Sequence, residues 1–235
     1  MKIDIVGVDA DDTLWHSEGH FHETESRFCE ILAPWAEADL VSSSLLDTER
    51  GNLSRFGYGV KGFTLSMIET AIELSAFRID AHGVEAIIEL GKALHDHPVE
   101  LIDGVEATLT GLAMDYRLVL VTKGDLFHQE SKVAASGIAD IFERVEIVAE
   151  KDVATYTRIL GEMSSAPNRF CMIGNSIKSD IAPVLDAGGA GVHIPYHLTW
   201  AMERAELDTG RPRFAQVDSI REAPEAVALL SAANR

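Results

Sequence analysis

Four short stretches of this sequence carry side chains that can do chemistry, although they lie far apart along the chain. They are Asp9-Ala-Asp-Asp-Thr13, Thr122-Lys-Gly-Asp125, Glu150-Lys151 and Gly174-Asn-Ser-Ile-Lys-Ser-Asp180. Together they offer carboxylates, hydroxyls and lysines, which are groups that bind a hard divalent cation, hold an anion or transfer a proton. If the fold brings the four stretches together, they can form a site for an anionic substrate.

Each stretch follows a segment whose composition predicts a buried β-strand. Residues 3–8 form a near-continuous apolar run rich in β-branched side chains, which is typical of a strand covered on both faces in a parallel sheet. Four later segments read the same way, namely residues 117–121, 145–148, 169–173 and 191–194. The sequence therefore predicts a parallel sheet of at least these strands.

The segments between the predicted strands have the apolar spacing of α-helices. Residues 126–136 run up to Gly137, a suitable helix end, and residues 153–163 place apolar side chains at helical intervals. Strands that alternate with such helices imply right-handed βαβ units and an α/β fold with a doubly wound parallel sheet. Ligands bind beyond the carboxyl ends of the strands in such sheets, so we expect the four stretches to converge at one edge.

The interval from residue 16 to residue 98 differs from the rest of the chain. It contains helix-like stretches at residues 22–32, 64–73 and 83–95 and no convincing strand. We interpret it as an all-helical insert between the first and second strands of the core.

This interpretation divides the chain into two domains. Residues 1–15 and 99–235 are predicted to form the α/β core domain, and residues 16–98 a helical cap. Near the C-terminus, residues 209–213 predict a surface loop and residues 219–232 a last helix.

Composition narrows the possible partners. The 235 residues include 38 acidic and 20 basic ones, for a formal net charge of −18. Such a surface repels nucleic acids and anionic bilayers, so we expect neither as a partner. No apolar run approaches the ~18 residues that span a membrane. The two cysteines, Cys29 and Cys171, fit reduced thiols, and we expect a cytoplasmic monomer or homodimer.

The four stretches, in this order and at this spacing, resemble the motifs of the haloacid dehalogenase superfamily, specifically its phosphatase branch. The resemblance covers essentially the whole chain and includes the apolar strand followed by D-x-D-x-T and the late G-N-S-x-x-x-D motif. It implies a Rossmann-like core with a helical insert at the position of the family's C1 cap.

The resemblance also implies roles for individual residues. Asp9 would attack phosphorus and form an aspartyl-phosphate intermediate. Asp11 would protonate the leaving alkoxide and then activate the water that hydrolyses the intermediate. Thr122 and the amide of Lys123 would bind the phosphoryl oxygens, and Lys151 would neutralise negative charge on the nucleophile and the transferred group.

A Mg²⁺ ion is the cofactor that the resemblance implies. Its expected ligands are the side chains of Asp9 and Asp180 and the main-chain carbonyl of Asp11, with the amide oxygen of Asn175 standing where the family often has an acid. We therefore expect the three aspartates to meet around a single ion. Lys178 is an alternative source of the catalytic lysine.

The expected substrate is a small phosphorylated metabolite, because a helical cap leaves little room for a macromolecule. Phe56, Tyr58 and Phe63 are candidates to line its pocket, or they pack within the helical insert. Two other functions stay open. A 2-haloacid dehalogenase is disfavoured by Asp11, since a departing halide needs no proton, and a catalytically weak binding or regulatory protein is suggested by Asn175.

Overall fold

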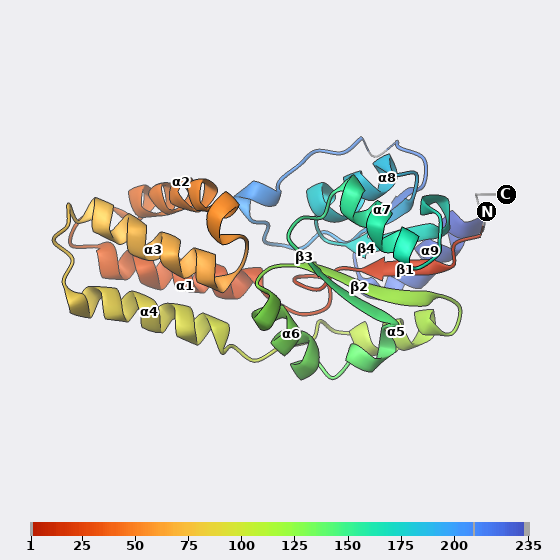
Figure 1. The fold of residues 1–235 in the computed structure, drawn as a ribbon, viewed down its shortest axis with the longest axis horizontal. Helices are drawn as coiled ribbons and strands as arrows, with labels where there is room; N and C mark the ends of the chain where they lie inside the picture. The colour runs from red at the N-terminus through yellow and green to blue at the C-terminus, as the bar shows by residue number, and fades with distance from the viewer. Residues whose placement is uncertain (1, 209, 233–235) are drawn as a thin grey trace. The chain divides into compact units, whose positions relative to one another are not determined.

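A six-stranded parallel sheet organises the larger part of the chain in this computed structural model, which describes residues 2–208 and 210–232 (Figure 1). The spatial order of the strands is β3-β2-β1-β4-β5-β6, so the chain leaves the central strand β1 first on one side and later on the other. The strands are β1 (Ile5–Val8), β2 (Arg117–Lys123), β3 (Arg144–Val148), β4 (Phe170–Gly174), β5 (Ala190–His193) and β6 (Phe214–Gln216).

Helices pack on both faces of this sheet, and successive strand residues alternate between the two apolar layers. On β1, Val6 joins a layer with Val105 and Val227, whereas Ile5 joins a layer with Tyr156 and Val184. The predicted doubly wound α/β fold is confirmed. The helices of this part are α5 (Val105–Ala113), α6 (Leu126–Ala135), α7 (Val153–Glu162), α8 (Ala182–Asp186) and α9 (Ala223–Ala232).

A second compact unit is made of helices around its own apolar core. The core includes Phe28, Leu45, Phe63, Met67 and Ile87, all buried. No strand occurs within residues 17–98, all of which the structure describes. The helices are α1 (Glu18–Leu32), α2 (Ala38–Phe56), α3 (Val60–Leu74) and α4 (Ala81–His95).

The two units are close to the predicted domains but not identical with them. The helical unit comprises residues 17–98 together with 124–128, and the sheet unit comprises the remaining residues described. Within this unit, Lys61 on α3 pairs with Asp125 of the short segment at 3.0 Å.

Two differences from the predicted elements lie near the C-terminus. Residues 214–216 form β6, which pairs with β5 and was not predicted. Of the predicted loop at residues 209–213, residue 209 lies outside the described residues. The last helix starts with a 3₁₀ turn, Ile220–Glu222, before α9. Among the described residues, no helix has the length and apolarity needed to cross a membrane.

Candidate active site

The loop after β1 holds Asp9 at the carboxyl edge of the sheet. The Asp9 amide donates to the carbonyl of Ile173 on β4 (2.9 Å), and the Thr13 hydroxyl donates to Asp9 Oδ2 (2.9 Å). The same hydroxyl accepts a hydrogen bond from the main-chain amide of Asn175 (3.1 Å). Thr13 therefore ties the first stretch to the last.

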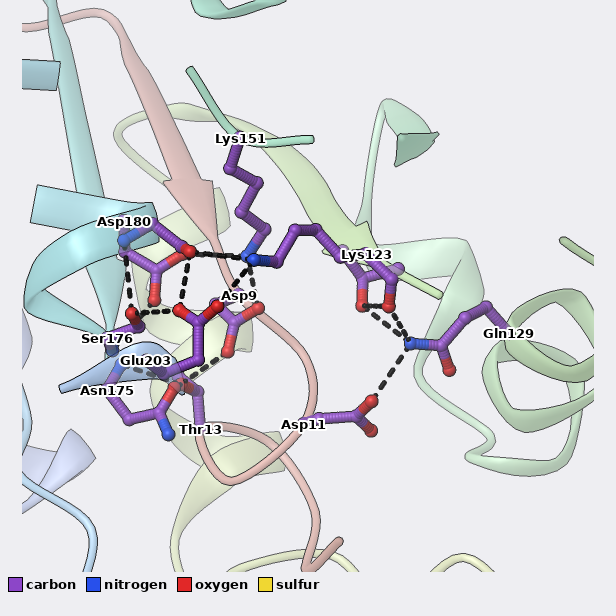
Figure 2. Close-up of polar contacts among 12 residues, drawn as sticks. Asp9, Asp11, Thr13, Lys123, Gln129, Lys151, Asn175, Ser176, Asp180 and Glu203 are labelled. Carbon is purple, nitrogen blue, oxygen red and sulfur yellow. Dashed lines mark hydrogen bonds and ion pairs between the residues drawn. The ribbon is translucent and has the colours of Figure 1, made fainter. Parts of the chain in front are cut away.

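A buried lysine joins two buried carboxylates at this edge. Lys151 Nζ donates to Asp9 Oδ1 and to Asp180 Oδ1, the latter at 2.7 Å (Figure 2). The side chains of Lys151, Asp9 and Asp180 are 3%, 8% and 1% exposed, so water screens this cluster weakly. The structure thus brings together three predicted site residues from distant parts of the sequence. Lys151 is 142 positions from Asp9 and 29 positions from Asp180.

The charges of this cluster do not balance. Burial and the negative charge of Asp180 raise the pKa of Asp9 to about 7, although Lys151 opposes the shift. Burial alone would lower the pKa of Lys151, but the two carboxylates hold it well above its usual range. Lys151 is therefore a permanent cation, and the site carries one more negative charge than it can readily hold.

An irregular turn after β4 presents Asp180. Residues Ile177–Ile181 form a π-helical turn, and the Ser176 amide donates to Asp180 Oδ2 (3.0 Å). Gly174 allows this carboxylate to approach, since a Cβ at Gly174 would lie only 2.3 Å from Asp180 Oδ2. A π-turn of this kind is common at functional sites.

Asp11 does not share the environment of Asp9 and Asp180. Its carboxylate pairs with Lys132 and accepts hydrogen bonds from Gln129 Nε2 (2.9 Å) and Trp15 Nε1 (2.6 Å). Burial alone would raise the pKa of Asp11, but Lys132, Gln129 and Trp15 together lower it. The Asp11 carboxylate is thus bound by Lys132, Gln129 and Trp15 and does not join the Lys151 cluster, while the contact of its main-chain carbonyl with a metal ion stays a prediction.

The second stretch begins inside β2, whose last two residues are Thr122 and Lys123. Thr122 is buried, and its Oγ1 accepts a hydrogen bond from Gln129 Nε2 (2.8 Å). The Lys123 ammonium donates to Ser179 Oγ (2.8 Å) and to Glu203 Oε1 (2.7 Å). Both predicted phosphate-binding residues thus lie at the edge where Asp9 lies.

Lys151, and not Lys178, is the lysine of the cluster. Lys178 Nζ donates to the Met202 carbonyl (2.7 Å), which directs it away from Asp9. Asp152, which follows Lys151, caps α7 by accepting from the Thr155 amide (2.7 Å). This cap fixes the loop from which Lys151 projects.

The three predicted aromatic residues belong to the helical unit, and each lies in a different setting there. Phe63 is buried in the helical core, edge-on to Phe21 at 5.3 Å between ring centroids. It packs in the helical core, which is one of the two roles that the sequence left open for it, and contact with a substrate stays a prediction. Phe56, at the end of α2, is 47% exposed, and Tyr58 is half-buried.

Three residues of the site have no counterpart in the predictions. Gln129 and Lys132 lie three residues apart on α6, and this spacing places both on the helix face that meets Asp11. The i, i+3 spacing is visible in the sequence, but nothing there shows that the face turns toward the sheet edge. Glu203 comes from the C-terminal segment, where no motif marks it.

The residues present suit a hard divalent cation. Mg²⁺ typically takes one or two carboxylates and keeps several waters, so Asp9 and Asp180 are a sufficient side-chain set. The surplus negative charge that raises the pKa of Asp9 is what a cation would offset. Within the described residues, no group of three or more His, Cys, Asp or Glu side chains converges.

A doubly wound sheet with a buried, lysine-bridged pair of aspartates at its carboxyl edge defines an α/β enzyme with an acidic centre. A model of the haloacid dehalogenase-like hydrolase family matches residues 3–188. The chain belongs to this family of hydrolases.

Several solved structures resemble this chain over nearly its whole length. A haloacid dehalogenase-like family hydrolase from Xanthomonas campestris is 46% identical over 99% of this chain and 94% of its own, with a TM-score of 0.90. A 2-haloacid dehalogenase from Pseudomonas syringae pv. Tomato is 19% identical over 97% of this chain and 99% of its own, with a TM-score of 0.64.

A predicted phosphoglycolate phosphatase from Haemophilus somnus is 16% identical over 96% of this chain and 98% of its own, with a TM-score of 0.62. At such identities, the likeness to this protein and to the Pseudomonas dehalogenase shows the fold alone. A comparison with curated proteins finds no significant match.

Proposed function

We propose that this hydrolase is a Mg²⁺-dependent phosphatase that acts on a small phosphorylated metabolite through an aspartyl-phosphate on Asp9. The observation that supports this most is the buried Lys151 between Asp9 and Asp180, with a second aspartate, Asp11, two residues from the nucleophile. A nucleophile, a fixed cation and an acid–base residue are the parts that phosphoryl transfer to a carboxylate requires.

In the first half-reaction, Asp9 attacks phosphorus and the bond to the leaving oxygen breaks. Lys151 stabilises the negative charge that builds up between Asp9 and the phosphoryl group, and it needs no reorganisation because both carboxylates already hold it. The Thr122 hydroxyl and the Lys123 amide are the proposed donors to the phosphoryl oxygens. The leaving oxygen takes a proton from Asp11.

In the second half-reaction, the Asp11 carboxylate takes a proton from a water whose oxygen attacks phosphorus. Phosphate departs, Asp9 is restored, and Asp11 is again protonated for the next turnover. The ionised Asp11 that Lys132 stabilises is the form that this step uses. General acid–base assistance of this kind typically contributes about 10²–10⁴-fold to the rate.

Asp9 and Asp180, with Asn175 close by, would hold the Mg²⁺ ion, which would supply positive charge where an anionic phosphoryl group approaches an anionic nucleophile. Asn175 carries no charge, so we expect weaker Mg²⁺ binding than with an acid at this position. Activity titrated against Mg²⁺ for wild type and Asn175→Asp tests this expectation, and equal half-saturating concentrations contradict it.

The test of the function is a screen of phosphorylated metabolites with Mg²⁺ and with a chelator, alongside halide release from 2-chloropropionate. We expect phosphate release that depends on Mg²⁺ and is lost in Asp9→Asn. Halide release without Mg²⁺ would instead show a dehalogenase, and inactivity on both panels would favour a binding or regulatory protein.

Labelled water separates the two enzymes by mechanism. In a single turnover in H₂¹⁸O, a phosphatase puts the label into phosphate, because water attacks phosphorus. A dehalogenase forms an ester on Asp9, water attacks the carboxyl carbon, and the label enters Asp9. We expect label in phosphate and none in the peptide that contains Asp9.

A further inference from the structure

A carboxylate from the C-terminal segment enters the site beside the four stretches. Glu203 lies in the 3₁₀ turn Ala201–Glu203 and accepts hydrogen bonds from Ser176 Oγ (2.6 Å), Ser179 Oγ (2.5 Å) and Lys123 Nζ (2.7 Å) (Figure 2). Its side chain is 15% exposed. It also lies beyond residue 188, where the match to the family ends.

The three partners of Glu203 belong to the parts that position the reacting groups. The main-chain amide of Ser176 donates a hydrogen bond to Asp180 Oδ2 (3.0 Å), and Ser179 directly precedes Asp180 in the chain. Lys123 ends β2, where its amide is a proposed phosphate donor. One carboxylate therefore spans from the strand β2 to the turn that presents Asp180.

The turn needs support from outside itself. Its π-helical hydrogen bonds are an uncommon arrangement that persists where the surroundings hold it. Besides the contacts of Glu203, Lys178 on this turn donates to the Met202 carbonyl (2.7 Å). Two neighbouring residues of the C-terminal segment thus hold the same turn.

Charge gives Glu203 a second effect. Burial alone would raise its pKa, but Lys123 and the two serine hydroxyls lower it, so the carboxylate is ionised at neutral pH. It forms an ion pair with the Lys123 ammonium at 2.7 Å, and Glu150 forms a second, longer one at 3.2 Å. Glu203 also supplies a negative charge near Asn175, where the family often has an acid.

We propose that Glu203 is a positioning residue of this site, which holds Lys123 and the Ser176–Asp180 turn in the arrangement that presents Asp180 to Asp9 and Lys151. This inference deepens the proposed function and rests on it for the role of Asp180 as a Mg²⁺ ligand. Groups that orient metal ligands typically contribute about 10–100-fold to metal affinity or activity.

The test compares wild type with Glu203→Gln, which keeps the shape and removes the charge, and with Glu203→Ala, which removes both. Glu206→Gln, at an exposed acid of the same segment, is the matched control. Isothermal titration with Mg²⁺ alone measures affinity, and steady-state kinetics with p-nitrophenyl phosphate separates kcat from KM.

We expect Glu203→Ala to weaken Mg²⁺ binding and to lower kcat by about 10–100-fold each, with little change in KM. Glu203→Gln should fall between Glu203→Ala and wild type, and Glu206→Gln should match wild type. If Glu203→Ala does not fold, the same comparison is decided by Glu203→Gln.

If the Glu203 variants bind Mg²⁺ as tightly as the wild type, the inference is overturned even if kcat falls. Such a result would show that Glu203 does not position Asp180. Absence of Mg²⁺ binding by the wild type overturns it as well. If the wild type binds Mg²⁺ but releases no phosphate from any ester, the proposed function fails, while the affinities of the variants still decide the role of Glu203.

Discussion

Two aspartates separated by one residue have opposite acid–base behaviour in this site. Burial and Asp180 raise the pKa of Asp9, whereas Lys132 and two neutral donors lower the pKa of Asp11 against the effect of its burial. Their environments differ because the loop after β1 turns sharply at Asp12, whose φ is +62°. A pair of acids with such different surroundings can divide two roles between them.

The raised pKa of Asp9 predicts a pH-dependent stability for the metal-free protein. The folded state keeps the Asp9 proton up to about pH 7, whereas the unfolded state loses it near 3.8. Stability therefore falls as pH rises from about 4 to about 7 and stays at the lower level above that range. Asn imitates the protonated form and leaves Lys151 paired with Asp180.

We accordingly expect Asp9→Asn to raise the free energy of unfolding above pH 7 by roughly 1 kcal/mol or more, with a smaller gain toward pH 4. Thermal melts with a chelator across this range measure the difference, and Asp115→Asn, at an exposed aspartate, is the control. A gain that is equal at all pH values would contradict the raised pKa.

The pair of Lys132 and Asp11 predicts a change in the pH–rate profile. Lys132→Met removes the cation that lowers the pKa of Asp11, so Asp11 should stay protonated to higher pH. As a protonated Asp11 is needed for the leaving group, the basic limb of kcat/KM should move upward in pH. Lys132→Arg keeps the charge, so its pH–rate profile should resemble that of the wild type. A basic limb that does not move in Lys132→Met would contradict the effect of Lys132 on the pKa of Asp11.

At the scale of elements, the strand ends determine where each functional side chain lies. The four stretches could be assigned to one edge from the sequence because buried parallel strands give unbroken apolar runs, as residues 3–8 do. The helix α2 was not predicted, since Ser42, Ser43, Ser44 and Gly51 weaken its helical signal. Its stability comes instead from packing of Val41 and Leu45 in the helical core.

The short edge strand β6 was missed for a related reason. Its three residues are too few to show a pattern, and pairing with β5 alone defines it. In the same way, Gln129, Lys132 and Glu203 could not be assigned from one sequence, because their contacts cross between separate elements.

Gly174 provides a test of how an element end shapes the site. A Cβ there would lie 2.3 Å from Asp180 Oδ2, so Gly174→Ala must displace the carboxylate. We expect a fall in kcat of about 10²-fold, which is what a misplacement of 1 Å typically costs. The control is Gly161→Ala on α7, where a Cβ meets nothing within 4 Å and the helix should gain about 0.5–1 kcal/mol. Full activity in Gly174→Ala would contradict the geometry.

At the scale of the whole molecule, a formal net charge of −18 opposes the approach of a phosphorylated substrate. Only local groups such as Lys151 favour the anion. Salt shortens the range of repulsion from about 30 Å at 0.01 M to about 8 Å at 0.15 M ionic strength. We expect kcat/KM to rise over this range at saturating Mg²⁺, with kcat little changed. A fall would show that local attraction outweighs the overall field.

The covalent role of Asp9 is the central claim, and mass spectrometry of the enzyme quenched during turnover tests it most directly. With Mg²⁺ and a phosphate ester that the enzyme hydrolyses, the peptide that contains Asp9 should carry a phosphoryl group, which is lost once the substrate is consumed. Asp9→Asn should carry none. Phosphate release with no phosphorylated peptide, or with the phosphoryl group on another residue, would contradict the account.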